Sequence, residues 1–166
     1  IADAAWSAAD CKDATGDQTR PDLWQSLGRV LRLEVNAMLD QQPPVGRWLT
    51  EEFLLAANTQ AAGGIRQAAE LLGQAESTFR RQLVKAQRLR RLGGGPKNPG
   101  WEDVAKIVLQ LVQVRTYGDA GDTGNLVLRS REVLLAVVSA ATEGRLSCGA
   151  ALMDVSTPTY KNWLSQ

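Results

Sequence analysis

An internal repeat constrains this chain more than any other feature of its sequence. Sliding the second half onto the first by 81 residues, without a gap, places Gly63 on Gly144 and Thr78 on Thr159. Apolar residues pair in the same register. Self-similarity at a fixed period is the sequence signature of a duplicated supersecondary unit. The alternative is that two helical stretches rich in Ala and Leu resemble each other by composition alone.

The apolar residues recur at intervals of three and four, which is typical of helices, and no strand pattern competes with them. Thr50, followed by two glutamates, indicates a helix N-cap. Clusters of Gly and Pro separate the predicted helices, and the run Gly93–Gly100 marks the clearest boundary. We predict helices over residues 23–41, 50–62, 65–72, 76–91, 101–114, 130–142, 147–153 and 157–165, with a turn region over 117–124.

The most informative stretch of the first half has the pattern of a helix-turn-helix. Such a unit needs a small residue where its helices approach closely, a turn residue that tolerates positive φ, and an apolar residue that pins the second helix. Ala69, Gly73 and Phe79 supply these three. In the second half Gly149 supplies the close approach, and Asp154 replaces the turn glycine, since Asp tolerates the left-handed region.

This motif resembles the Fis-type helix-turn-helix, which is also found at the C-terminus of sigma-54 enhancer-binding activators. The residues that match the family pattern Ala-Ala-x-x-Leu-Gly-x-x-x-x-Thr-Leu-x-x-x-Leu are Ala68, Ala69, Leu72, Gly73, Thr78, Phe79 and Leu83. The family usually has an Arg at the opening of the recognition helix, where this chain has Glu76 in one copy and Thr157 in the other. A carboxylate at that position would repel phosphate.

The resemblance implies an all-α fold of two Fis-like four-helix units, each ending in a helix-turn-helix, packed as an intrachain pseudo-dimer. The expected domains are an N-terminal linker or extension at 1–19, a first unit at 20–92, a Gly/Pro linker at 93–100 and a second, divergent unit at 101–166. The recognition helices would be 76–91 and 157–165, and on straight DNA about 34 Å would separate them.

Local charge points to DNA as the partner, although the formal net charge of the whole chain is only +1. From Ser77 to Gly100 there are seven Lys or Arg residues and no Asp or Glu. Such a run can contact phosphates without reading sequence. The candidate DNA-binding residues are Ser77, Thr78, Arg80, Arg81, Lys85 and Arg88 in the first copy and Thr157, Thr159, Lys161 and Asn162 in the second.

Other function classes find little support in the composition. The chain has no histidine, which removes Ser-His-Asp catalysis and His-ligated zinc. We therefore expect no enzyme activity, no metal and no cofactor. No apolar run reaches the roughly 18 residues of a membrane span. The two cysteines are too few for a disulfide framework and favour a cytoplasmic location, which for a bacterial DNA-binding protein is the nucleoid.

Two functions stay open on the sequence alone. The first is double-stranded DNA binding, in transcription regulation or in DNA architecture. The second is a degenerate helix-turn-helix module for protein interaction or oligomerisation without DNA binding of its own, which Glu76, the near-neutral net charge and the divergent second copy favour. Upstream regulatory or ATPase domains, as in the activators, or a separate protein partner, would be compatible with either function.

Overall fold

A computed structural model describes residues 22–116 and 124–166, which form eight helices and no strand. The prediction of an all-α fold is confirmed for these residues. The predicted extension at 1–19 and nearly all of the predicted turn region at 117–124 lie outside the described residues. The helices are α2 (Leu23–Ala37), α3 (Val45–Gln60), α4 (Ile65–Leu72), α5 (Glu76–Arg91), α6 (Trp101–Thr116), α7 (Leu126–Ala141), α8 (Leu146–Met153) and α9 (Thr157–Leu164). In the described part of the chain, no helix is long and apolar enough to cross a bilayer.

The bounds of α4 and α5 match the prediction, but the predicted starts of two long helices were wrong. Helix α3 begins at Val45, five residues before the predicted N-cap at Thr50, because Pro44 itself occupies the N-cap position. A proline there costs nothing, since the first N–H groups of a helix lack partners within the helix. Helix α7 begins at Leu126, not at residue 130, and the side chain of Asn125 accepts a hydrogen bond from the Leu128 N–H at 3.1 Å.

Four long helices form the centre of the fold, and they pack mainly across the two halves of the chain. Helix α2 packs against α6 and α7, and α3 packs against the same two helices. The apolar residues that meet between them are fully buried, among them Leu31, Phe53, Val108 and Leu134. The N-terminal four helices and the C-terminal four therefore share one core.

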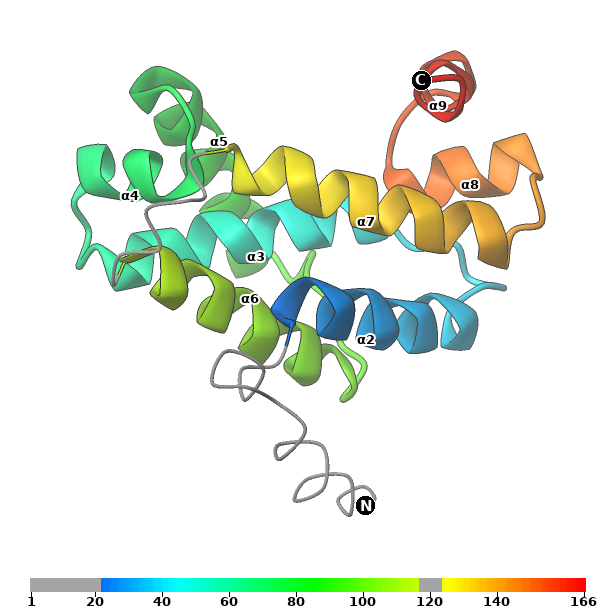
Figure 1. The fold of residues 1–166 in the computed structure, drawn as a ribbon, viewed down its shortest axis with the longest axis horizontal. Coiled ribbons are helices and arrows are strands. Elements are labelled where there is room, and N and C mark those ends of the chain that lie inside the picture. Colours follow the sequence, from blue (N-terminus) through cyan, green and yellow to red (C-terminus); the bar gives the residue numbers. More distant parts are fainter. Residues whose placement is uncertain (1–21, 117–123) are drawn as a thin grey trace, which may run out of the picture.

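The short helices lie at the two ends of this core (Figure 1). Helices α4 and α5 lie at one end of the long axis, and α8 and α9 lie at the other end. The beginning of α5 and the whole of α9 project on the same side of α3 and α7.

Each short-helix turn closely approaches the start of a long helix from the other half. A Cβ atom on Gly73, in the turn after α4, would lie 2.6 Å from the Gly124 carbonyl oxygen. A Cβ atom on Gly46, in the first turn of α3, would lie 2.8 Å from the carbonyl carbon of Met153, the last residue of α8. Contacts this close to backbone atoms leave no room for a side chain at either position.

Unusual backbone angles recur 81 residues apart, at the offset of the predicted repeat. The residue after α4 and the residue after α8 are both left-handed, with φ of 73° at Gly73 and 60° at Asp154. The turns after α3 and α7 each contain two consecutive residues with positive φ. These are Ala62 and Gly63 (52° and 86°) and Glu143 and Gly144 (53° and 81°). The backbone of 62–73 thus follows the same turns as the backbone of 143–154.

Candidate nucleic-acid interface

Helices α4 and α5 form the predicted first helix-turn-helix. The turn residue Gly73 is left-handed, and Gln74 N–H donates back to the Ala69 carbonyl at 3.0 Å, which closes the end of α4. Ala69 and Phe79 are both buried, as the motif requires. The three residues singled out in the sequence therefore take the positions predicted for them.

Helices α8 and α9 lie where the second helix-turn-helix was predicted, and other residue types make its close approach, turn and cap. Gly149 lies directly against the buried ring of Tyr160, which confirms its predicted part in the close approach. Asp154 is left-handed, as expected for the turn residue. Ser156 caps α9 by accepting from the Thr159 N–H at 3.3 Å, and Pro158 lies in the first turn, where its missing N–H is not needed.

The outer face of α5 carries a row of exposed cations. Arg81, Lys85 and Arg88 are spaced at i, i+4 and i+7, which places them on one side of the helix. The opposite side is buried through Phe79 and Leu83. Among the residues that the structure describes, no carboxylate pairs with any of the three cations. This row is called the basic face below.

Glu76, which the sequence analysis treated as a residue that would repel phosphate, has a partner. Its carboxylate accepts from the Arg80 guanidinium at 2.8 Å, one turn further along α5. Arg80 is thus turned toward Glu76, and the two charges offset each other at the N-terminal end of the helix. Ser77 is exposed beside them, whereas Thr78 is half-buried.

The corresponding residues of α9 are exposed but much less charged. Thr157, Lys161 and Asn162 are exposed, and Lys161 is the one cation of this helix. Thr159 is half-buried, and its hydroxyl oxygen accepts from the Ser156 hydroxyl at 2.9 Å. The ten predicted residues therefore fall into two groups, at the two ends of the molecule.

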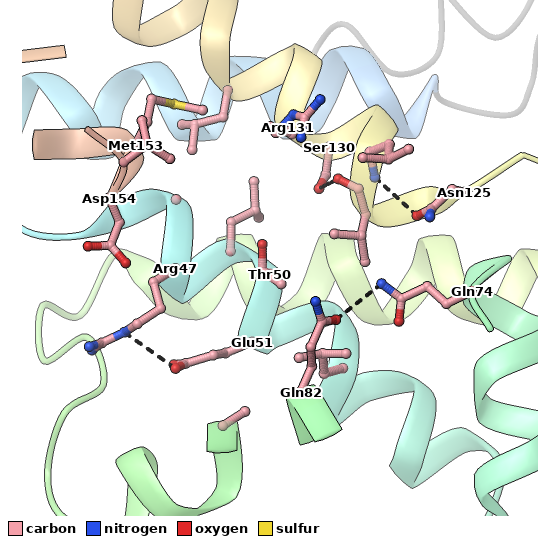
Figure 2. Close-up of a pocket in the computed structure, with 18 of the residues that line it drawn as sticks. Arg47, Thr50, Glu51, Gln74, Gln82, Asn125, Ser130, Arg131, Met153 and Asp154 are labelled. Carbon is pink, nitrogen blue, oxygen red and sulfur yellow. Dashed lines mark hydrogen bonds and ion pairs between the residues drawn. The ribbon is translucent and has the colours of Figure 1, made fainter. Parts of the chain in front are cut away.

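A groove of about 460 Å³ lies between the two helix-turn-helix units (Figure 2). Its floor is formed by α3 and α7, and Thr50 and Ser130 lie there. Gln82 of α5 lines one side, where it accepts from the Gln74 side-chain amide at 3.3 Å, and Asp154 of the α8–α9 turn lies on the other. No group of three or more potential metal ligands occurs within the described ranges.

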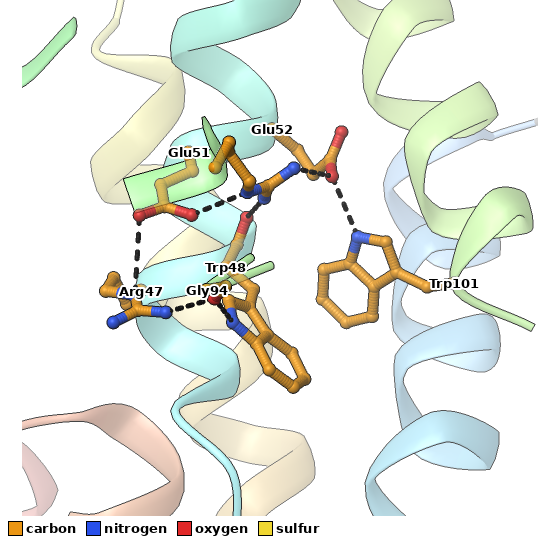
Figure 3. A network of polar contacts seen from close by, with 7 residues as sticks. Arg47, Trp48, Glu51, Glu52, Gly94 and Trp101 are labelled. Carbon is orange, nitrogen blue, oxygen red and sulfur yellow. Dashed lines mark hydrogen bonds and ion pairs between the residues drawn. The ribbon is translucent and has the colours of Figure 1, made fainter. Parts of the chain in front are cut away.

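A partly buried polar network fixes the C-terminal end of α5 on α3 (Figure 3). The Arg90 guanidinium donates to Glu51 at 2.8 Å, to Glu52 at 3.2 Å and to the Trp48 carbonyl at 3.3 Å. The Trp101 indole N–H donates to the same Glu52 at 2.9 Å and so joins α6 to the network. The helix that carries the basic face is thus tied to α3 at its C-terminal end.

The same network shows what the sequence reasoning missed. Glu51 was expected at a helix start, yet it lies inside α3 and is only 3% exposed. The available signal was the position of Arg90, which continues the i, i+4, i+7 and i+11 pattern of the buried side of α5. The linker is also engaged, because the Gly94 carbonyl accepts from the Trp48 indole at 2.9 Å and from the Arg47 guanidinium.

Comparison with known proteins gives one informative similarity. A curated protein of Xylella fastidiosa (strain Temecula1), named "Putative Fis-like DNA-binding protein", is 36% identical over 74 residues, which is 44% of this chain and 82% of that protein. No protein-family model matches the chain, and no solved structure gives a significant match. Together, the helix-turn-helix geometry and a match over four fifths of this relative show that the chain belongs to the Fis-like DNA-binding proteins.

Proposed function

We propose that this protein binds double-stranded DNA through α5 and α9, in transcription regulation or in organisation of the bacterial nucleoid, and that it is not an enzyme. The observation that carries the proposal is the basic face. Its three exposed cations lie on the second helix of a helix-turn-helix, the helix that enters the major groove in such units. The name of the Xylella fastidiosa relative supports the same function.

In this proposal the two halves act as the two protomers of a Fis-type dimer joined in one chain. Three observations support it. The positive-φ residues recur at the offset of the sequence repeat, the long helices pack across the halves, and the two helix-turn-helix units lie at opposite ends of the core with α9 and the start of α5 on one side. The units 20–92 and 101–166 would each offer one recognition helix to successive major grooves.

The direct test is a titration of a labelled duplex against salt, read by fluorescence anisotropy. The variant is the triple substitution R81A/K85A/R88A, and wild-type protein is measured beside it. Each lost phosphate contact lowers the slope of log K against log salt by about 0.9 on B-DNA. We expect the slope to fall by roughly 2 if Lys85 and Arg88 alone contact phosphate, and by roughly 3 if Arg81 does so too, with weaker binding at every salt concentration.

A matched control removes the same charge from helices outside the two helix-turn-helix units. Arg29 and Arg32 are exposed on α2 and Lys106 is exposed on α6, and Figure 1 shows these two helices below α3 and α7, whereas α9 lies above them. The triple substitution R29A/R32A/K106A should leave the slope nearly unchanged. An equal fall in slope for both triple variants would mean that only net charge matters. Unchanged slope and affinity for R81A/K85A/R88A would contradict the proposal.

A second candidate function is protein interaction through the same face. Val84 lies between Arg81 and Arg88 on α5 and is 59% exposed, and Leu92 just beyond the helix is 76% exposed. Exposed apolar residues beside cations suit a protein surface as well as a thymine methyl group. Failure of the wild-type protein to bind any duplex at 50 mM salt would favour this function.

A further inference from the structure

We propose that the DNA site of this protein is non-palindromic, with a G·C pair read by Arg81 of α5 and an A·T pair read by Asn162 of α9. The inference deepens the proposed function and rests on it. It concerns the kind of DNA sequence that the two recognition helices select.

Arg81 and Asn162 occupy equivalent places in the two units. Helix α5 begins at Glu76 and α9 begins at Thr157, so each residue is the sixth of its helix, at the offset of the internal repeat. Both side chains are exposed. The N-terminal part of a recognition helix is the part that contacts base edges in the major groove.

The two side chains have different hydrogen-bonding capacities. The guanidinium of Arg81 offers only donors and matches the two acceptors O6 and N7 of guanine. The amide of Asn162 offers one acceptor and donors, and it matches N6 and N7 of adenine. Equivalent positions therefore favour different bases in the two half-sites.

The first turns of the two recognition helices also carry different residues. The first turns present Glu76 and Ser77 in α5 but Thr157 and Pro158 in α9. A dimer of identical protomers reads two identical half-sites, and its operator is a palindrome for that reason. Two unlike recognition helices in one chain remove that requirement.

Phosphate contacts should be as unequal as base contacts. Beyond the base-reading turns, α5 carries Lys85 and Arg88, whereas α9 has Lys161 alone and ends at Leu164. The α5 half-site would therefore supply most of the salt-sensitive affinity. Such a protein binds its site in one orientation only.

The experiment is selection from a random duplex library by the wild-type protein, R81N and N162R, followed by sequencing. The wild type should enrich an asymmetric motif with a required G in one half and a required A in the other, about one helical turn apart. R81N should exchange the required G for A in one half only, and N162R should exchange A for G in the other. Each exchange should change the relative affinity for the two bases by about fivefold to 150-fold.

The control is R32N, which makes the same substitution at an exposed residue of α2 and should leave the motif unchanged. A palindromic motif, no motif at all, or a motif that R81N does not alter would overturn this inference while the proposed function stands. If the wild-type protein retains no duplex at low salt, the proposed function itself fails. The two failures are thus distinguishable.

Discussion

The contact between Gly149 and Tyr160 allows a quantitative test of the packing in the second helix-turn-helix. Gly149 lies inside α8, and a Cβ atom there would lie 2.5 Å from Cε2 of the Tyr160 ring and would also overlap Cζ and the hydroxyl oxygen. The ring is fully buried, so it has no room to retreat without shifting α9. The substitution Gly149→Ala therefore overfills the site.

The size of the effect follows from two opposing contributions. Overfilling a packed core typically costs about 1–3 kcal/mol. Alanine in place of glycine inside a helix returns about 1 kcal/mol of helix propensity. We expect Gly149→Ala to lower the free energy of unfolding by up to about 2 kcal/mol, which at this chain length lowers Tm by up to roughly 8 °C.

The first helix-turn-helix shows which second substitution should compensate. Its equivalent pair, at the offset of the repeat, is Ala68 with Phe79, and both are fully buried. That unit thus carries the extra methyl group but lacks the ring hydroxyl. The Tyr160 hydroxyl is buried and has no hydrogen-bond partner in the described part of the chain, so Tyr160→Phe alone should be neutral or stabilising by up to about 1 kcal/mol.

The assay is urea unfolding of the wild type, both single variants and the double variant, with m-values compared to establish that only stability changes. The double variant should be more stable than the sum of the single effects predicts, with a coupling of about 1 kcal/mol. Strict additivity, or a Gly149→Ala variant more stable than the wild type, would refute the reasoning.

Three further predictions concern charged residues. Glu76→Ala should tighten duplex binding about fivefold at low salt, because it frees Arg80 and removes a carboxylate whose repulsion of phosphate is about 1 kcal/mol. Glu70→Ala breaks a similar ion pair on α4 and should leave binding unchanged. Equal binding by both variants in an anisotropy titration would contradict this prediction. Glu51→Gln should lower the free energy of unfolding by about 1–3 kcal/mol, because it removes the buried carboxylate charge that Arg47 and Arg90 share, although Arg90 keeps Glu52. Glu132→Gln, at the exposed equivalent position, should change it by no more than about 0.5 kcal/mol, and thermal melts that shift alike for both variants would rule the prediction out. Burial and the Asp103 carboxylate raise the pKa of Glu34 above its ordinary value of 4.5, against the lowering effect of the hydrogen bond from Asn98. The stability that Glu34 contributes is therefore present at acid pH and lost as the pH rises through the pKa of the folded state. The urea midpoint of Glu34→Gln should rise relative to that of the wild type between pH 4 and pH 7. A difference in midpoint that does not change with pH would count against this prediction.

The helix-turn-helix units could be predicted from the sequence because local residues determine them. Gly73 and Asp154 mark their own turns through the conformations that they tolerate, and the apolar residues of α4 and α5 repeat at helical spacing. The bounds of α4 and α5 followed from these local signals alone. The left-handed turns of the two halves likewise lie 81 residues apart, where the predicted repeat places them.

What the sequence did not reveal depends on contacts between distant residues. Glu51 finds Arg90 across 39 positions of sequence, so neither residue alone indicates a buried ion pair. The charge of Glu76 looked unfavourable for DNA until its contact with Arg80 was seen. The early start of α3 was obscured because two prolines, usually a sign of a helix end, here directly precede a helix.

The core that the long helices share also determines what would follow from cleavage of the chain between its two halves. Helices α2 and α3 bury their apolar sides mainly against α6 and α7, so neither half could shield its own hydrophobic surface after separation. A protease cut in the glycine-rich stretch before α6 would produce two fragments, and each would need the other to bury its apolar surface. Such a nicked protein would remain associated as a complex of two peptides and would come apart only on unfolding.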